Sequence, residues 1–292
     1  MALPADRFLD INIKEILRQA VLNLQEERIQ TASIDARVLL EHVLRVSREE
    51  LLFSFDLLMD EEQYYYYQEL LKKRVKGFPV AKLIGNRQFW GIDFSVNNYT
   101  LDPRPDSETV IESALAYIEN RASVIRVLDL GTGSGCLLIS LLSELPSASG
   151  VGVDCCDNAL SVARKNAVSA GVADRVEFFR SNWCANVNDK FDVVLANPPY
   201  IPSAVIERLE PDVKDYEPML ALDGGSDGLS CYRDILKELP EFMNDGGIAV
   251  FEIGIGQEED FGKIATGHGF DIAGFRKDLS GITRCVILRH NK

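Results

Sequence analysis

Two segments of the sequence combine residue types and spacing that suit group-transfer chemistry. In the first, FDVVLANPPYIPS, an apolar run ends at Asn197, and two prolines and Tyr200 follow. Because proline fixes φ and has no N–H, the loop offers hydrogen-bond acceptors, namely the Asn197 side-chain oxygen and the Pro198 carbonyl. Two fixed acceptors suit a planar NH₂, either an amide or the exocyclic amine of a base, on which Tyr200 can stack. The loop is predicted to aim such a nitrogen at the methyl group of a sulfonium, and positioning of this kind can lower a barrier by about 7 to 11 kcal/mol.

The second segment, VLDLGTGSGC, reads as a strand, a turn with three glycines and the start of a helix. Glycines at such a turn let backbone N–H groups and the helix N-terminus approach a ligand. Asp154, at the end of the next strand, can accept hydrogen bonds from ribose hydroxyls. Asp129, before the turn, suits a ligand with a sulfonium or ammonium better than a pyrophosphate, and the dinucleotide and P-loop patterns are incomplete or missing. The segment predicts a pocket for a cationic nucleoside such as S-adenosylmethionine.

A third segment, SNWC, follows a further strand and carries Asn182 and Trp183. Trp183 could pack on an adenine while Asn182 bonds the edge of the base. Each of the three segments also has a purely structural interpretation: the first as a proline-rich loop, the second as a tight strand-to-helix turn, and the third as a loop whose tryptophan belongs to the core. Their positions at the ends of successive strands favour a shared site.

The elements that would position these residues alternate between strand and helix from about residue 123 onward. Such alternation predicts an α/β fold with a mostly parallel sheet and helices on both faces, and the ending from Phe270 fits two further strands with an antiparallel edge. Ligands of these sheets bind outside the carboxyl ends of the strands. The three segments would therefore meet at one edge.

The part before the sheet has a different character. Over residues 11–76 apolar residues recur at helical spacing, which predicts a small helical bundle with Ser33 and Asp60 as N-caps. Gly, Asn and Pro then punctuate short apolar pieces, which predicts a β-hairpin and a linker. Asp106 is expected to cap the following helix, which runs to about Glu119.

Bulk properties narrow the class of protein. The 292 residues are 46% hydrophobic and 26% charged, enough for a sizeable core, and the net charge of −14 disfavours non-specific binding to nucleic acid. Apolar runs are too short to span a membrane, and charged residues near the start do not fit a signal peptide, so a cytosolic location is expected. The six cysteines show no C-x-x-C pair and no zinc-like spacing from histidine, which predicts reduced thiols and no metal site.

The combination of DLGTGSG, GVD and NPPYI resembles S-adenosylmethionine-dependent amino-methyltransferases. LDPRPDSETV, YEPMLAL, DGLSCYRDIL, EIGIGQ and DLSGITR narrow the resemblance to the peptide chain release factor glutamine methyltransferases of the HemK/PrmC type, over nearly the whole chain. Three positions depart from the usual pattern of that family: Asp102 replaces an apolar residue, Asn182 replaces an aspartate, and Lys82 stands where an aromatic residue is common.

The resemblance implies a helical substrate-recognition domain over 1–82, a hairpin linker over 83–105 and a seven-stranded, Rossmann-like methyltransferase domain over 106–292. The substrate would be the glutamine of the Gly-Gly-Gln motif of bacterial-type release factors, with no membrane and no nucleic acid as direct partner. Arg104 and Glu108 are expected to line the mouth of the site. Together the patterns and the resemblance assign cofactor binding to Gly131, Thr132, Gly133, Ser134, Gly135, Asp154, Asn182, Trp183 and Asn197, substrate binding to Asn197, Pro198, Pro199 and Tyr200, and catalysis to Asn197, Pro198 and Tyr200.

Three alternatives stay open from the sequence. A sister family with the same loop methylates a ribosomal-protein glutamine, and adenine-N6 methyltransferases of nucleic acid share N-P-P-Y, although the acidic chain disfavours phosphate contacts. A cofactor-binding adaptor without catalysis is the third, and the intact Asn197 and Tyr200 oppose it.

Overall fold

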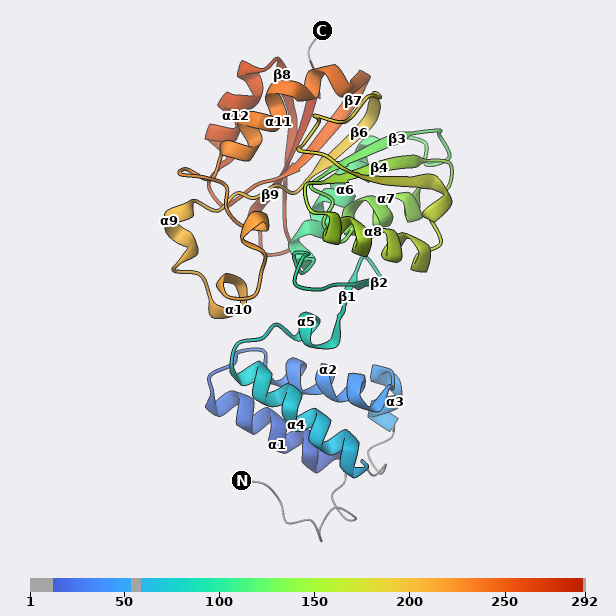
Figure 1. Ribbon diagram of the computed structural model, residues 1–292. Helices are drawn as coiled ribbons and strands as arrows, with labels where there is room; N and C mark the ends of the chain where they lie inside the picture. The colour runs from blue at the N-terminus through green and yellow to red at the C-terminus, as the bar shows by residue number, and fades with distance from the viewer. Residues whose placement is uncertain (1–12, 54–58, 291–292) are drawn as a thin grey trace. The chain divides into compact units, whose positions relative to one another are not determined.

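The computed structural model describes residues 13–53 and 59–290 of the chain. Contacts divide it into two compact units, residues up to Gly85 and residues from Asn86 onward, coloured blue to cyan and teal to red in Figure 1. The division falls just before the hairpin of β1 (Asn86–Phe89) and β2 (Ile92–Ser95). Each unit has a hydrophobic core of its own.

The first unit is helical, as its apolar spacing predicts. Asp60 caps a helix with a reciprocal hydrogen-bond pair to Gln63, which confirms the predicted N-cap. The Ser33 prediction is wrong, because the second helix begins at Ala32 with Thr31 at the N-cap position, two residues before Ser33. The described helices of this unit are α1 (Ile13–Glu26), α2 (Ala32–Leu44), α3 (Arg48–Phe53), α4 (Glu61–Val75) and α5 (Val80–Ile84).

The second unit opens with the hairpin of β1 (Asn86–Phe89) and β2 (Ile92–Ser95), followed by a 3₁₀ turn, η2 (Pro105–Ser107), and α6 (Glu108–Tyr117). The expected role of Asp106 as N-cap is wrong, since it lies inside η2 and Ser107 precedes the helix. Instead, the Asp106 carboxylate pairs with Arg284 from the far end of the chain at 3.2 Å. This pair holds the turn against the sheet.

A seven-stranded mixed sheet forms the centre of the second unit, which confirms the predicted fold class. The strand order is β5-β4-β3-β6-β7-β9-β8, with the first five strands parallel and β9 antiparallel to both neighbours. The order reverses at β3, because β4 lies on one side of it and β6 on the other. The strands are β3 (Arg126–Leu130), β4 (Ser149–Asp154), β5 (Val176–Arg180), β6 (Phe191–Ala196), β7 (Met243–Glu252), β8 (Phe270–Lys277) and β9 (Thr283–His290).

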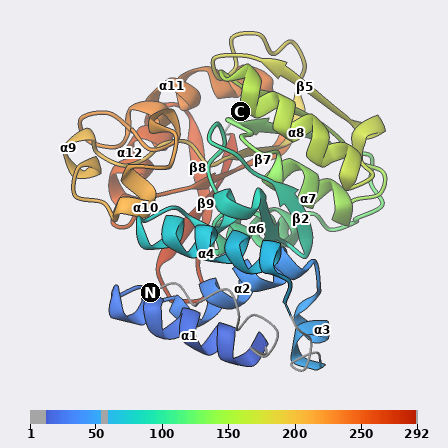
Figure 2. The same cartoon turned by 60° about the horizontal axis from the view of Figure 1, so that its bottom comes forward.

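Helices cover both faces of this sheet because its strands are apolar on both sides. Val127 belongs to the core under α6, α7 (Cys136–Glu144) and α8 (Asp157–Ser169), whereas its neighbour Leu128 belongs to the core under α11 (Ser230–Glu238) and α12 (Glu258–Gly267). Figures 1 and 2 show α7 and α8 side by side on the first face. The shorter elements on this unit are η3 (Ala173–Arg175) and η5 (Leu239–Phe242).

A long excursion leaves the carboxyl end of β6 and returns at α11. It contains α9 (Ser203–Ile206), α10 (Pro211–Lys214) and η4 (Met219–Ala221), and it begins with the N-P-P-Y sequence. Among residues 13–53 and 59–290, no helix has both the length and the apolar character that crossing a membrane requires.

Candidate functional site

A cavity of about 470 Å³ lies at the carboxyl ends of the parallel strands. This volume is within the range of small-molecule sites. The structure brings together nine of the twelve predicted site residues in its wall: Gly131, Thr132, Gly133, Ser134, Asp154, Asn182, Trp183, Asn197 and Pro199. The other three, Gly135, Pro198 and Tyr200, do not line it.

Asp154 links the glycine turn to the start of α8. One carboxylate oxygen accepts from the backbone N–H of Gly133 at 2.9 Å, and the other accepts from that of Cys156 at 2.9 Å. A carboxylate has about four lone-pair positions, so both oxygens can accept further hydrogen bonds. Asp154 is therefore rigidly placed and still able to bind vicinal hydroxyl groups in the cavity.

Trp183 covers the first glycine of the turn. It has a left-handed backbone with φ of +49°, and a Cβ added to Gly131 would lie 3.3 Å from its ring. A bulky residue in this conformation is unusual and indicates that the surroundings hold it there. Asn182 lies beside it in the cavity wall, so the structure offers one aromatic face and one side-chain amide at the same point.

Gly135 serves the packing of helices. Its φ is +81°, and an added Cβ would lie 2.8 Å from Ile139 and 3.2 Å from the Cβ of Ala163. The third glycine of the turn thus lets α7 and α8 approach each other closely, which explains why it is absent from the cavity wall.

Asn197 directly follows β6 and faces the cavity with a fixed amide. Its Nδ2 donates to the Ser107 hydroxyl at 3.2 Å, so its Oδ1 is the atom left to accept a hydrogen bond. Pro198 is buried, and the Tyr200 ring packs against the core under α11 and α12. The Tyr200 hydroxyl donates to Glu252 at 3.2 Å. Tyr200 therefore anchors the loop in this structure, and its predicted stacking on the substrate remains a prediction.

Asp129 lies next to the cavity wall without being part of it. It is 1% exposed, and its Oδ2 accepts from the Thr132 hydroxyl at 2.6 Å. Burial raises the pKa of this carboxyl to about 7, and the nearby Asp154 adds to the rise while the bond from Thr132 opposes it. Asp129 therefore holds the glycine turn through Thr132. A cation bound in the cavity would favour the charged form of the Asp129 carboxyl.

Comparison with known proteins identifies the family of this chain. Residues 15–85 match the PrmC N-terminal domain and residues 113–208 match the methyltransferase small domain. The release factor glutamine methyltransferase of Bradyrhizobium diazoefficiens is 38% identical over 98% of this chain and 97% of its own. That of Geobacter sulfurreducens is 37% identical over 94% of this chain and 95% of its own. The chain belongs to the release factor glutamine methyltransferase family.

Membership of this family confirms the resemblance that the motifs carry. A solved methyltransferase from Pyrococcus furiosus also shares the fold, with a TM-score of 0.51 and 15% identity over 77% of this chain and 100% of its own. Like other members of a methyltransferase family, this chain is an enzyme that needs a methyl donor beside an acceptor. The wall of the cavity supplies candidate groups for both.

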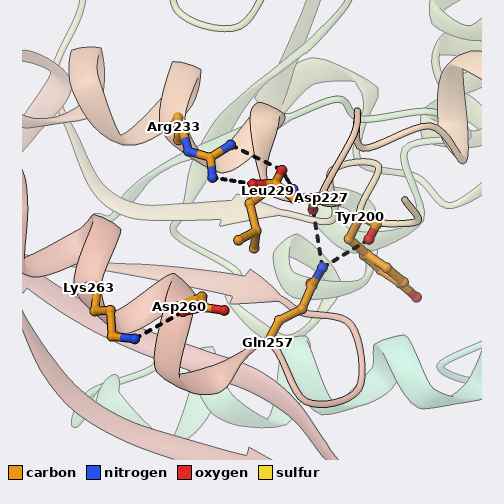
Figure 3. A network of polar contacts seen from close by, with 8 residues as sticks. Tyr200, Asp227, Leu229, Arg233, Gln257, Asp260 and Lys263 are labelled. Carbon is orange, nitrogen blue, oxygen red and sulfur yellow. Dashed lines mark hydrogen bonds and ion pairs between the residues drawn. The ribbon is translucent and has the colours of Figure 1, made fainter. Parts of the chain in front are cut away.

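Gln257, at the start of α12, fixes the end of the N-P-P-Y loop in this family member. Its Nε2 donates to the carbonyl oxygens of Tyr200 at 3.0 Å and Gly228 at 3.2 Å, and Figure 3 shows the side chain reaching toward Tyr200. Its Oε1 accepts from the Gly254 backbone at 2.8 Å. Three loops are thus joined through one amide.

Several residues around the site escaped the sequence analysis. Ser107 lines the cavity, and Glu252 and Gln257 hold the loop. All three lie in the segments LDPRPDSETV and EIGIGQ that carry the family resemblance, but the sequence analysis gave them no role of their own. Arg104 lines the cavity as expected and pairs with Glu217 at 3.2 Å. The expectation for Glu108 is wrong, because its carboxylate accepts from the Trp90 backbone at 2.8 Å and does not line the cavity.

Replacing Gly228 by alanine tests how tightly the loop is held. Gly228 and Gly246 have φ of +76° and +77°, so Gly228→Ala and Gly246→Ala pay the same conformational cost of about 1 to 2 kcal/mol. A Cβ at Gly228 would collide with the Tyr200 carbonyl oxygen and lie 2.8 Å from Gln257, whereas at Gly246 no atom of the described residues lies within 4 Å. In urea unfolding, we expect Gly228→Ala to lower the free energy of unfolding by about 1 to 3 kcal/mol more than Gly246→Ala does. We also expect Gly228→Ala to lower the methyl-transfer rate. Equal losses for the two variants would refute tight packing at this loop.

Replacing Asp129 by asparagine tests the buried carboxyl through pH. Its pKa is raised from 3.8 to about 7, so the folded state favours the neutral form. The stability that depends on this form is complete below about pH 4 and is lost as the pH rises through about 7. Because asparagine escapes that loss, we expect Asp129→Asn to raise the melting temperature relative to the wild type more at pH 8 than at pH 5. Asp174→Asn, at an exposed position, is the control, and a pH-independent difference for Asp129→Asn contradicts the interpretation.

Proposed function

We propose that this chain transfers a methyl group from S-adenosylmethionine to the side-chain amide nitrogen (N5) of the glutamine in the Gly-Gly-Gln motif of peptide chain release factors. Full-length relatives named release factor glutamine methyltransferase support the substrate. The proposal places the enzyme in the cytoplasm with a protein as its partner. The net charge of −14 disfavours the alternative of a nucleic-acid substrate.

A single observation carries the proposal: one cavity is lined both by the groups suited to a nucleoside and by the group suited to an amide. Asp154 and Trp183 belong to the first set, and Asn197 to the second. Methyl transfer needs donor and acceptor in contact within one water-poor space, because the reacting atoms must lie about 3 to 3.5 Å apart. A binding module for the nucleoside alone would have no need of Asn197 in the same wall.

The residues present fit S-adenosylmethionine. The Asp154 carboxylate is fixed by two backbone N–H groups and keeps lone pairs for the ribose hydroxyls. The Trp183 ring provides a face for the adenine, and Asn182 provides donors and an acceptor for its edge. The Asp129 carboxyl next to the turn favours a cationic ligand once it is charged.

S-adenosylmethionine, when bound, supplies a methyl group on a cationic sulfur that becomes a neutral thioether as the methyl leaves. The amide nitrogen of glutamine is a weak nucleophile because its lone pair is delocalised. The Nδ2 of Asn197 donates to Ser107, so the Oδ1 of Asn197 can accept a hydrogen bond from one N–H of the glutamine amide. The Pro198 carbonyl is the proposed acceptor for the other N–H. Holding both hydrogens aims the nitrogen lone pair along the line of transfer. The methylated nitrogen then releases its proton to water, so no catalytic base is needed.

The direct test of the proposed function is a methylation assay with labelled S-adenosylmethionine. The acceptors are a release factor, its variant with the Gly-Gly-Gln glutamine replaced by alanine, a ribosomal-protein glutamine acceptor and duplex DNA. We expect label on the unmodified release factor alone. Label on the alanine variant, on the ribosomal protein in its place, or on DNA alone would refute the assignment.

Asn197→Ala separates the role in transfer from cofactor binding. We expect the turnover number to fall by about 100-fold or more, because the acceptor amide loses its partner, while the dissociation constant for S-adenosylmethionine changes little. Steady-state kinetics and calorimetric titration measure the two quantities. Asn188→Ala, at an exposed loop position, is the control and should leave both unchanged. Unaltered turnover in Asn197→Ala would remove Asn197 from the mechanism.

A further inference from the structure

Three large, mainly apolar side chains lie at the opening of the cavity. Tyr99 belongs to the turn after β2, and Met219 and Leu220 belong to η4, far away in the sequence. All three line the cavity, yet Tyr99 is 53% exposed, Met219 52% and Leu220 74%. Residues that both line a cavity and face solvent mark its mouth. These three residues are called the apolar rim below.

The turn that carries Tyr99 is fixed by short-range hydrogen bonds. The Asn97 side-chain oxygen accepts from the Tyr99 backbone N–H at 2.9 Å, and the Thr100 hydroxyl accepts from the Asn97 backbone N–H at 3.2 Å. Thr100 is buried and anchors the turn, while Tyr99 next to it stays exposed. The first part of the rim is therefore held in place by the chain itself.

The helical turn η4 is held at both of its ends. Before it, the Glu217 carboxylate accepts from the Asp102 backbone N–H at 3.3 Å and from the Arg104 guanidinium at 3.2 Å. After it, the Leu222 carbonyl accepts from the backbone N–H of Ile201 at 3.1 Å. Ile201 directly follows the N-P-P-Y sequence, so η4 is joined both to the segment before η2 and to the N-P-P-Y loop. Its exposed side chains consequently lie on a fixed platform.

The charged residues that these two segments contribute to the cavity wall are engaged within the fold. They are Arg104, which pairs with Glu217, and Asp223, whose Oδ1 accepts from the Ser203 hydroxyl at 2.6 Å and from the Gly225 backbone at 2.9 Å. The rim itself carries no charge, although the whole chain has a net charge of −14. Such a surface suits an uncharged partner segment, because a charged one would lose hydration there without gaining a partner.

The size of the cavity decides which part of a protein substrate can enter it. Its volume of about 470 Å³ is in the range of small-molecule sites, so it can hold single groups but no folded segment. Asn197 lies in the same wall as the rim, and an acceptor glutamine that reaches Asn197 leaves its own main chain at the mouth. That main chain must then lie against the rim. Aromatic and methionine side chains are enriched at surfaces that bind other proteins.

We propose that Tyr99, Met219 and Leu220 form the docking surface for the main chain of the release-factor loop that carries the target glutamine. The proposal rests on the proposed function and adds to it the surface that holds the substrate protein beside the cavity. The Gly-Gly-Gln motif carries no charge, which matches the uncharged rim. Its two glycines have no side chains that would keep the main chain away from these residues. The rim supplies affinity for the substrate, and Asn197 positions the glutamine.

Leu220→Ser is the sharpest variant, because Leu220 is the most exposed residue of the rim. We expect the KM for the release factor to rise about tenfold, since an apolar contact with the substrate is lost. The turnover number should change less than about twofold, because this contact is made equally before and during transfer. Leu220→Met keeps the apolar area and should stay within about twofold of the wild-type KM. Because the contact is apolar, the ratio of variant to wild-type KM should be the same at low and high salt.

A control and a second variant complete the kinetic test. Leu279→Ser is the matched control, because Leu279 is fully exposed between β8 and β9, outside the cavity wall, and this variant should keep the wild-type KM. Tyr99→Ser changes the other segment of the rim and should also raise the KM about fivefold or more. A wild-type KM in either Leu220→Ser or Tyr99→Ser would overturn the proposal. A loss of affinity for S-adenosylmethionine as large as the rise in KM, measured by calorimetric titration, would also overturn it, because the rim would then serve the cofactor.

The same experiments separate this proposal from the proposed function. If the wild-type protein methylates a release factor and the rim variants keep its KM, the docking surface alone is wrong. If the wild-type protein methylates no release factor, the proposed function is wrong and the docking surface falls with it. Sedimentation velocity tests a different occupant: a change from dimer to monomer in Leu220→Ser, with an unchanged KM, would assign the rim to a second copy of this chain and overturn the proposal.

Discussion

The parallel pairing of β3 with both β4 and β6 is the constraint on which the site depends. Leu130, the last residue of β3, pairs with Val153 on one side and Ala196 on the other. The residues that follow these strands consequently leave the sheet at one edge, although they are far apart in the sequence. Because the strand order reverses at β3, the helices that follow β3 and β6 cover opposite faces and leave a crevice between them. The glycine turn, Asp154 and Asn197 meet there because of this register.

The N-P-P-Y loop raises a second structural problem, since two consecutive residues cannot donate backbone hydrogen bonds. Such a loop has to be held by groups from elsewhere. Ser107 holds the Asn197 amide, Glu252 holds the Tyr200 hydroxyl, and Gln257 holds the Tyr200 carbonyl. These three supports come from η2, β7 and α12, so the geometry of the loop depends on the completed fold of the second unit. This explains why a loop without regular structure can carry a precisely placed acceptor.

The sequence predicts the parts of this protein that local patterns determine. Apolar runs ending in Gly, Asp or Asn located the strand ends and nine of the twelve site residues in the cavity wall. Helical spacing in the YYYY run leaves Tyr67 buried and Tyr66 half exposed, in keeping with an amphipathic helix. The supports of the loop could not be predicted, because Ser107 and Asn197 lie 90 residues apart and no periodicity relates them. Asp106 failed as an N-cap for the same reason: its partner, Arg284, lies 178 residues away.

Two buried acids next to the cavity follow one physical logic. Asp129 accepts a hydrogen bond from the hydroxyl of Thr132 in the cavity wall, and Glu252 accepts one from the hydroxyl of Tyr200 in the N-P-P-Y loop. Burial raises the pKa of both carboxyls, so each disfavours folding to the extent that it is charged. A buried amide in either place would avoid this cost, but it can donate as well as accept and would leave the direction of the hydroxyl proton undetermined. In its charged form each carboxyl can only accept, and therefore fixes the direction of the hydroxyl proton that it takes. In the proposed complex a cationic cofactor would favour the charged form of Asp129, so that binding itself would strengthen the hydrogen bond from Thr132 that holds the glycine turn.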